Sequence, residues 1–426
     1  MPLKAGFAQA DITPPVGTHK IGWLRDLVSD RVLDPLHASC AVLTGGEQGI
    51  GFIQLDTLSV RWTTVQDIRQ RISEHFGFPG GNVLVAATHN HAGPAVANVG
   101  DVRRDDAYVE TMVEATVEAF GRALADREDA QVGFGRAFDF DIGHNRRVVM
   151  RDGTVKTHAT FDDPEALFIE GPIDPEVAVM AARAKDGHML GVVVNFACHP
   201  THHGGDGCLT AGFPGALACD MAAAGCPATV FLNGASGNIT DVDPSRGGTR
   251  MEPDQIGRIL ANHVTKLLPN LTYRDDLCLS CRRAMVELPF RDPGDEEIAG
   301  TIRGAQRFVD PTVYDRVIPK VIERTRRMGT QPAEVQAIFV GDRAFVGIPA
   351  EYFVEHGLRI KEEGWPLHTL VVSCANGMVG YVPHADAFRR GGYETTFTGS
   401  SRLAPEAGDI LADCAIDLVR AGPSEG

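Results

Sequence analysis

The chain has 426 residues, of which 43% are hydrophobic and 23% charged, and a formal net charge of −16 at pH 7. This length and composition are typical of a globular protein with a sizeable core, built as one large domain or as two or three smaller ones. The acidic balance argues against binding to nucleic acids or to anionic membranes, because proteins of those classes normally carry a basic surface.

The sequence shows no export or membrane signal. Neither its first residues nor any later stretch contains the long uncharged apolar run that a signal peptide or a membrane span needs, so we expect a cytoplasmic protein without integral membrane association. The nine cysteines are an odd number, and we expect reduced, mostly buried thiols. Those inside apolar runs are Cys40, Cys198, Cys374 and Cys414. Cys278 and Cys281 form a lone CxxC, which we interpret as two strand residues rather than a zinc or redox motif.

Apolar runs and amphipathic stretches alternate along the chain. Residues 63–76 and 107–125 carry apolar residues at helical spacing and are predicted to be surface helices that pack on a sheet. The apolar runs before, between and after them are predicted to be buried strands, at 51–55, 83–87, 191–196, 228–232, 345–348 and 370–373. The pattern predicts an α/β fold of layered mixed β-sheets flanked by helices, without a linker long enough to separate domains.

Residues 284–330 differ in character from the rest of the chain. Two polar amphipathic stretches, GDEEIAGTIRGAQRF and YDRVIPKVIERTRRM, predict helices there. They form either a cap over a functional site or a solvated helical insertion, and we favour the insertion.

Polar side chains and small glycine-rich turns follow five of the predicted strands. His89 and His91 come after the first such strand, His199 after the next, and Glu351 and Tyr381 after two later ones. In α/β sheets the ligand crevice lies outside the carboxyl ends of strands, so we expect a site there. Residue types and spacing alone leave two interpretations open, a hydrolytic metal site or structural histidines, because no short signature joins the candidates.

Five ordered segments carry a resemblance to a known family. THNHAGP, NFACHPT, GASGNIT, IPAEYF and ANGMVGYVPHADAFRRGGYE, together with the opening AQADITPPVG, resemble the hallmark segments of the neutral, non-lysosomal ceramidase superfamily. The match extends from about residue 5 to 400 as spaced motifs. It implies a single catalytic domain over residues 1–426, with a metal site at the carboxyl ends of strands. Family members that act on lipid aggregates usually carry a further immunoglobulin-like domain; we expect none here, and this difference weakens the expectation of a lipid substrate.

The resemblance also implies roles for individual residues. One zinc ion would be held by His89, His199, Glu351 and Tyr381, an arrangement of N and O ligands typical of a catalytic rather than a structural site. His91 would lie beside the metal as a proton carrier. Arg146 and Tyr393 would donate hydrogen bonds to the developing oxyanion, and water activated by zinc would attack the carbonyl.

Two positions depart from the family pattern. In GNIT, Thr240 stands where the family has a serine and Asn238 where it has an acid. A β-branched hydroxyl is stiff at χ1, so we expect Thr240 to shape the site or to hydrogen-bond rather than to act as a nucleophile. Gly212 stands where the family tends to carry an aspartate, which puts a substrate contact in doubt.

The resemblance favours hydrolysis of an amide (N-acyl) bond in a small-molecule or lipid-like substrate. One alternative is that the same zinc centre hydrolyses a small polar amide, lactone or ester, and another is a non-catalytic metal- or carbohydrate-binding protein. Three loops expected to border the site are polar and glycine-rich rather than apolar, at 99–106, 201–207 and 241–252. They favour a short acyl group, and the sequence leaves the oligomeric state open.

Overall fold

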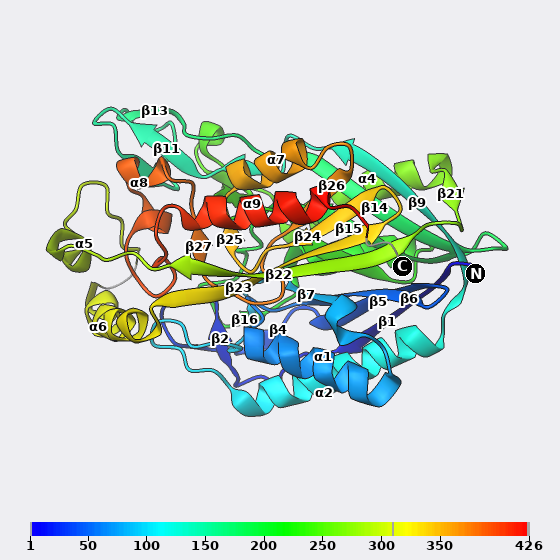
Figure 1. Cartoon of the computed structure of the whole chain (residues 1–426). Coiled ribbons are helices and arrows are strands. Elements are labelled where there is room, and N and C mark those ends of the chain that lie inside the picture. Colours follow the sequence, from blue (N-terminus) through cyan, green and yellow to red (C-terminus); the bar gives the residue numbers. More distant parts are fainter. Residues whose placement is uncertain (1, 309–310, 424–426) are drawn as a thin grey trace.

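A nine-stranded mixed sheet forms one half of the structure (Figure 1). The computed structural model describes residues 2–308 and 311–423. The strand order is β17-β15-β14-β9-β1-β5-β6-β7, with β21 added to β9, and the pairs β15–β17 and β6–β7 are parallel whereas the other pairs are antiparallel. The strands are β1 (Lys4–Asp11), β5 (His37–Gly45), β6 (Gln48–Leu55), β7 (Val83–Ala87), β9 (Glu128–Phe138), β14 (Glu176–Ala184), β15 (Met189–Phe196), β17 (Thr229–Asn233) and β21 (Tyr273–Arg274).

A four-stranded sheet packs face to face on the larger one. Its order is β22-β23-β24-β26, and only the last pair is parallel. Its strands are β22 (Leu279–Pro289), β23 (Thr330–Val340), β24 (Arg343–Gly347) and β26 (His368–Val372). Phe52 of the first sheet and Phe345 of the second belong to the same buried cluster, and their ring centroids lie 4.8 Å apart. The two sheets therefore share one apolar core.

Helices cover the outer face of each sheet, so the fold has four layers (Figure 1). α1 and α2 pack on one part of the large sheet and α3 and α4 on another, while α7 and α9 cover the small sheet. The helices are α1 (Trp62–Phe76), α2 (Asp106–Ala125), α3 (Gly212–Ala223), α4 (Pro253–Leu267), α5 (Asp295–Ala299), α6 (Pro311–Met328), α7 (Val354–Glu363), α8 (Ala387–Arg390) and α9 (Ala407–Arg420). This architecture confirms the predicted α/β fold of layered mixed sheets flanked by helices.

The layering explains why the buried strands are apolar throughout. In β7, Val83 and Val85 face the core under α1 and α2, while Leu84 and Ala86 face the core between the sheets. Successive side chains of a strand point to opposite faces, so a strand covered on both faces needs an unbroken apolar run. Each predicted strand lies in a strand of the structure to within one residue at its ends.

Short strand pairs connect the loops at one end of the two sheets. The pairs are β10 (His144–Asn145) with β18 (Ile239–Thr240), β25 (Glu351–Tyr352) with β27 (Tyr381–Val382), β4 (Arg31–Val32) with β16 (Cys208–Leu209), and β19 (Val242–Asp243) with β20 (Thr249–Arg250). Two small three-stranded sheets accompany them. One consists of β2 (His19–Ile21), β3 (Leu27–Val28) and β8 (Gly93–Pro94), and the other of β11 (Arg147–Met150), β12 (Val155–Thr157) and β13 (Ala166–Ile169). Most of the sequence-predicted site residues lie in or next to these pairs.

The segment at 284–330 begins within β22 and includes α5 and α6. The buried residues of α6 include Tyr314 and Ile318, which cluster with Phe397. The backbone N–H of Gly392 donates to the carbonyl of Gly304 at 2.8 Å, so this segment also contacts the chain just before Tyr393. α6 is therefore packed on the site-bearing part of the chain along one side.

All nine cysteines are free thiols, and Cys40, Cys198 and Cys374 are fully buried whereas Cys414 is half-buried. Cys281 lies in β22, where it receives a hydrogen bond from the Gln336 amide. Within residues 2–308 and 311–423, no helix combines the length and the apolar character needed to cross a membrane.

Candidate metal centre

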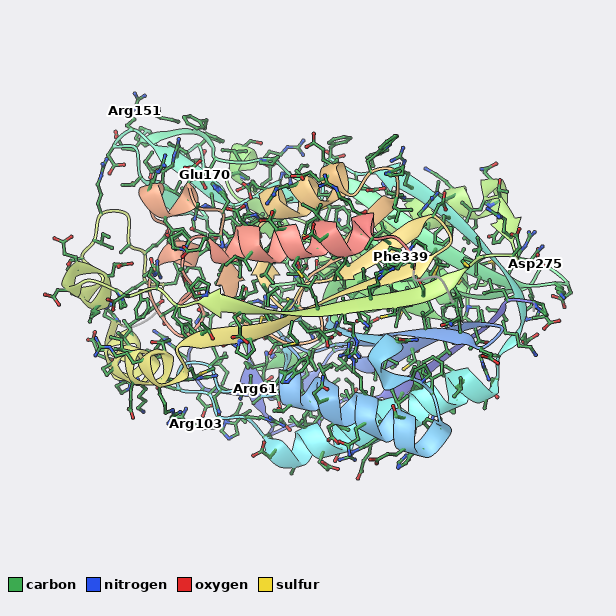
Figure 2. The ribbon with its side chains drawn as sticks, viewed as in Figure 1. Arg61, Arg103, Arg151, Glu170, Asp275 and Phe339 are labelled. Carbon is green, nitrogen blue, oxygen red and sulfur yellow. The ribbon has the colours of Figure 1, made fainter. Side chains whose placement is uncertain are left out.

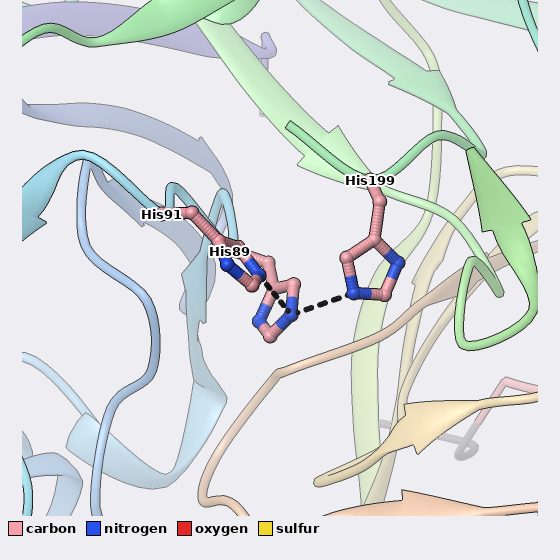
Figure 3. Close-up of side chains that lie close together, drawn as sticks. All are labelled: His89, His91 and His199. Atoms are coloured by element: carbon pink, nitrogen blue, oxygen red, sulfur yellow. Dashed lines mark hydrogen bonds between the residues drawn. The ribbon is translucent and has the colours of Figure 1, made fainter. Parts of the chain in front are cut away.

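Three histidine rings meet at the carboxyl ends of two strands of the large sheet (Figure 3). His89 and His91 follow β7, and His199 follows β15. The Nε2 atom of His89 lies 2.9 Å from that of His199 and 3.3 Å from that of His91. His89 and His199 are buried, and His89 adopts a left-handed backbone conformation with φ 67°, which is uncommon for a side-chain-bearing residue.

Backbone carbonyls fix which nitrogen of each ring carries the proton. A carbonyl oxygen can only accept a hydrogen bond, so a ring nitrogen bonded to it must be protonated and the other nitrogen of a neutral ring carries a lone pair. All three rings make such a bond through Nδ1. The pairs are His89 with Leu58 at 2.8 Å, His91 with Gly22 at 2.7 Å and His199 with Ser236 at 2.6 Å. Three Nε2 lone pairs thus face one another, an arrangement that a metal cation stabilises.

Glu351 brings a carboxylate to the same point. Its Oε2 lies 3.2 Å from Nε2 of His89 and 3.4 Å from Nε2 of His199. Two ligand atoms each about 2.0–2.1 Å from a tetrahedral zinc ion would lie roughly 3.3–3.4 Å apart, so the spacing fits a metal of that size. Burial alone would raise the pKa of Glu351, but the two imidazoles hold that pKa well below its ordinary range. Among the described residues, Glu351 approaches no nitrogen of His91 within 4 Å.

Tyr381 is placed beside Glu351 by backbone pairing. In the parallel pair of β25 and β27, Glu351 lies directly opposite Tyr381. The Tyr381 ring stacks over His199 with centroids 6.5 Å apart, and its hydroxyl accepts a hydrogen bond from Nη2 of Arg146 at 3.2 Å. Both the proposed oxygen ligands therefore lie on one side of the histidine cluster.

A buried ion-pair network holds Arg146. Glu394 accepts hydrogen bonds from Nε of Arg146 and from Nη1 of Arg147, both at 2.8 Å, and Arg147 also pairs with Glu170. Burial by itself would raise the pKa of Glu394, but the two guanidiniums and a hydrogen bond from Thr157 lower it to about 2. Buried charges of this kind need several partners, which this network supplies. Glu394, Arg147 and Glu170 were not among the residues identified from sequence.

Tyr393 lies at the edge of the cluster. Its ring meets that of Tyr381 edge-on with centroids 5.7 Å apart, and that of Phe308 at 4.7 Å. Burial raises the pKa of Tyr393, so the phenol stays protonated at neutral pH and can donate a hydrogen bond. Phe308 and His158, whose ring centroids are 5.9 Å apart, are both solvent-exposed and mark an accessible side of the site. Neither residue was identified from the sequence.

Thr240 forms no hydrogen bond with His89, His91 or His199 in the described chain. It is fully buried in β18, and its hydroxyl makes only long hydrogen bonds within the described chain, to the carboxylate of Asp241 and from the N–H of Val242, both at 3.4 Å. Asn238 accepts from the first N–H of α7 and donates to Glu355, so it anchors that helix. The structure thus gives these two positions local structural contacts.

A second group of possible ligands lies in the loop after His199. His203, Asp206 and Cys208 approach one another, with Nδ1 of His203 2.8 Å from the Asp206 carboxylate. The buried ammonium of Lys20 already donates to the backbone carbonyls of His203 and Asp206, at 2.9 and 2.6 Å. Since Lys20 supplies a positive charge to this loop, the cluster around His89 is the better candidate for a metal.

Comparison with known proteins identifies the fold. No family model and no curated protein matches the sequence. Two solved structures match over 100% of this chain and 76% of their own: neutral ceramidase from Pseudomonas aeruginosa, with a TM-score of 0.76 and 17% identity, and a ceramidase complexed with C2, with a TM-score of 0.75 and 16% identity. The chain has the neutral ceramidase fold. At this identity, the neutral ceramidase structures establish the architecture, and the individual site residues rest on the geometry above.

One departure from the neutral ceramidase sequence pattern has a local explanation in the backbone. Gly212 begins α3 with φ 62°, in the left-handed region that favours glycine. Its N–H donates to the hydroxyl of Thr210 at 3.0 Å. The conformation of this turn therefore accounts for a glycine here.

Proposed function

We propose that this protein is a zinc-dependent hydrolase that cleaves an amide (N-acyl) bond with water. The observation that carries the proposal is the convergence of imidazole Nε2 atoms and the Glu351 carboxylate on one point, with every Nδ1 occupied by a backbone carbonyl. Imidazole and carboxylate ligands with a weakly held further position are typical of catalytic zinc sites. The neutral ceramidase fold supports the reaction class.

Four side chains would hold the metal. His89, His199 and Glu351 face one another at ligand-like distances, and Tyr381 lies opposite Glu351 in the β25–β27 pair. Zinc, when bound, polarises a carbonyl and lowers the pKa of a coordinated water to roughly 7. The carbonyls of Leu58 and Ser236 orient the two imidazoles and make Nε2 the available nitrogen.

Three further side chains would act on the substrate. Nη1 of Arg146 has no hydrogen-bond partner among the described residues, so it can donate to the carbonyl oxygen of the substrate while Nε and Nη2 hold the group in place. The phenol of Tyr393 is a second donor on the same side. His91, fixed through Nδ1 by Gly22, presents Nε2 to accept a proton from water and return it to the leaving amine.

No covalent nucleophile is required by this arrangement. Thr240 is the hydroxyl that the family pattern offers for that role, and it is fully buried, with hydrogen bonds to Asp241 and Val242. We therefore assign Thr240 a structural role in the β10–β18 pair, where it lies opposite His144.

Two loops next to the site favour the smaller, more polar substrate class within this proposal. A Cβ placed on Gly204 would lie 3.1 Å from Cβ of His91, so the 201–207 loop packs directly on that histidine. Arg250, from the 241–252 loop, donates to the hydroxyl of Thr201 at 3.0 Å. Polar loops bury few methylenes, which favours a short acyl group over a long lipid chain.

The test combines metal content with turnover of a chromogenic acyl amide. We expect about one zinc per chain, loss of both zinc and turnover in His199→Ala and His89→Ala, and retained zinc with lost turnover in His91→Ala. His188→Ala, which changes an exposed histidine, is the matched control and should keep both. Equal metal loss in all three site variants would make His91 a ligand, and a metal-loaded wild type without turnover of any acyl amide, ester or lactone would refute the hydrolase.

A further inference from the structure

A cavity lies beside the N-terminus of α1. It has a volume of about 180 Å³, and its lining includes three arginines, Arg61, Arg324 and Arg402. These residues come from the start of α1, from α6 and from the segment before α9. Figure 2 labels Arg61 at the N-terminal end of α1. None of the proposed metal ligands lines this cavity, so it is separate from the metal centre.

The three guanidiniums are close enough to repel one another. Burial, followed by the charges of Arg324 and Arg61, lowers the pKa of Arg402 to about 10. Burial and the charges of Arg104 and Arg324 likewise lower the pKa of Arg61. Like charges gathered in a partly desolvated place destabilise the fold unless an anion compensates them.

None of the three arginines forms an ion pair with a carboxylate in the described chain. The nearby carboxylate of Asp106 is paired with Arg104, and it raises the pKa of Arg61 less than burial and the neighbouring guanidiniums lower it. Arg402 donates to the carbonyl of Gly399 at 2.5 Å and to the amide oxygen of Gln331 at 3.1 Å, both neutral acceptors. Within residues 2–308 and 311–423, neither Arg61 nor Arg324 forms an ion pair, and the side chain of Arg324 donates a hydrogen bond to the sulfur of Met328.

Glu334 also lines the cavity, but its carboxylate is paired with two other arginines. One of its oxygens is 2.7 Å from Nη1 of Arg69 and the other is 3.4 Å from Nη1 of Arg283. It therefore does not neutralise the three arginines.

The backbone adds further donors. α1 begins after Arg61 without a side-chain cap and without an acidic residue in its first turn. Its first N–H groups and the positive end of its dipole are thus available to an anion. A Cβ on Gly377 would lie 3.9 Å from the backbone nitrogen of Trp62, so the absence of a side chain there keeps this end of the helix open to the cavity.

We propose that this cavity is a binding site for a phosphate-type oxyanion, held by the guanidiniums of Arg61, Arg324 and Arg402 and by the first turn of α1. Guanidinium forks match the oxygen geometry of phosphate, and several of them around one cavity form a typical phosphate site. The ligand is either free phosphate or the phosphate group of a small ester. The site does not depend on the proposed hydrolase activity.

Three of the lining segments lead directly to the metal centre. Pro349 precedes Glu351 by two residues, Val379 precedes Tyr381 by two, and Arg61 follows Leu58, whose carbonyl holds His89, by three. Two or three residues span at most about 7–11 Å, so an anion bound in the cavity would contact backbone segments that lie this close to the proposed metal ligands. Binding of the anion would therefore restrict the motion of these segments and stabilise the proposed metal centre.

The test is calorimetric titration of the purified full chain with inorganic phosphate and, separately, with glycerol 3-phosphate, at constant ionic strength. We expect one saturable site in the wild type and at least about 10-fold weaker binding in Arg324→Gln, the scale of one charge-assisted hydrogen bond. Arg327→Gln removes the same charge from an equally exposed position of the same helix that does not line the cavity, and it should change the affinity less than about 2-fold. The tighter of the two probes identifies the source of the phosphate group.

Two further measurements separate this site from alternatives. Phosphate can also bind a metal ion, so the arginine-dependent binding should persist in His199→Ala. In phosphate-free buffer, Arg324→Gln should leave the melting temperature unchanged or raise it, because the variant removes repulsion, and it should abolish the rise that phosphate produces in the wild type. Absence of saturable binding, or equal loss in Arg324→Gln and Arg327→Gln, would overturn the proposal.

Discussion

Replacing Glu394 with glutamine tests how the buried network holds Arg146. Glu394 is completely buried, and its two oxygens accept from Arg146, Arg147 and Thr157. Its pKa is about 2 in the folded protein, against an ordinary value of 4.5. A difference of that size corresponds to about 3 kcal/mol of stability at pH 7, at 1.36 kcal/mol per unit. Breaking a buried ion pair by removing one partner costs a similar amount, about 3–5 kcal/mol.

The assay is urea denaturation at several pH values. At pH 7, Glu394→Gln should lower the free energy of unfolding by about 3 kcal/mol, whereas Glu47→Gln, at an exposed turn between β5 and β6, should change it by less than about 0.5 kcal/mol. Because the folded-state pKa is depressed, this contribution is complete above about pH 4.5 and is lost as the pH falls toward 2. The difference in the free energy of unfolding between Glu394→Gln and the wild type should therefore become smaller as the pH falls. A variant as stable as wild type at pH 7, or a gap that does not depend on pH, would refute the reasoning.

Further predictions concern the reaction itself. Tyr393→Phe should lower kcat by about 10²-fold or more, the effect of removing one oxyanion donor, and a loss below about 3-fold would remove Tyr393 from that role. Thr240→Ala should keep measurable turnover, and an acyl adduct on Thr240 detected by mass spectrometry would contradict the mechanism. In a series of N-acyl substrates, kcat/KM should stop rising beyond about six to eight carbons, because each methylene left in water forfeits about 0.8 kcal/mol. A steady gain up to long-chain ceramide would instead establish a lipid substrate.

The fold could be predicted where the sequence pattern is local. α1 and α2 have apolar residues at helical spacing, and α1 ends at Gly77 with φ 63°, which matches the end expected from sequence. The parallel strands were visible as unbroken apolar runs because they are covered on both faces. The long strands β9 and β22 were missed because half-buried and exposed residues interrupt their buried ones and their sequences include several charged side chains. β5, β14 and β23 were also missed, although most of their residues are buried.

The site could be predicted only in part, for a physical reason. The histidines stand directly after buried strands, which sequence reveals. The partners that orient them are backbone carbonyls, such as those of Leu58 and Gly22. Every residue has a backbone carbonyl, so the residue type does not indicate which ones bind the imidazoles. Glu394 and Arg147 are 247 residues apart in the chain, so only the folded structure brings them together. The arginine cavity is likewise assembled from six separate stretches of the chain between Arg61 and Arg402.

The distance along the chain between the groups of the candidate metal centre affects when that centre can form during synthesis. His89 contacts His199 across 110 residues, and Cys374, next to His89, across 285. Contacts of such long range form late, because the loops between them must close first. A ribosome-bound chain would expose His89 and His91 well before Glu351 and Tyr381 are made. The complete set of proposed ligands therefore exists only after Tyr381 has been translated, and we expect any metal to bind after rather than before the chain has folded.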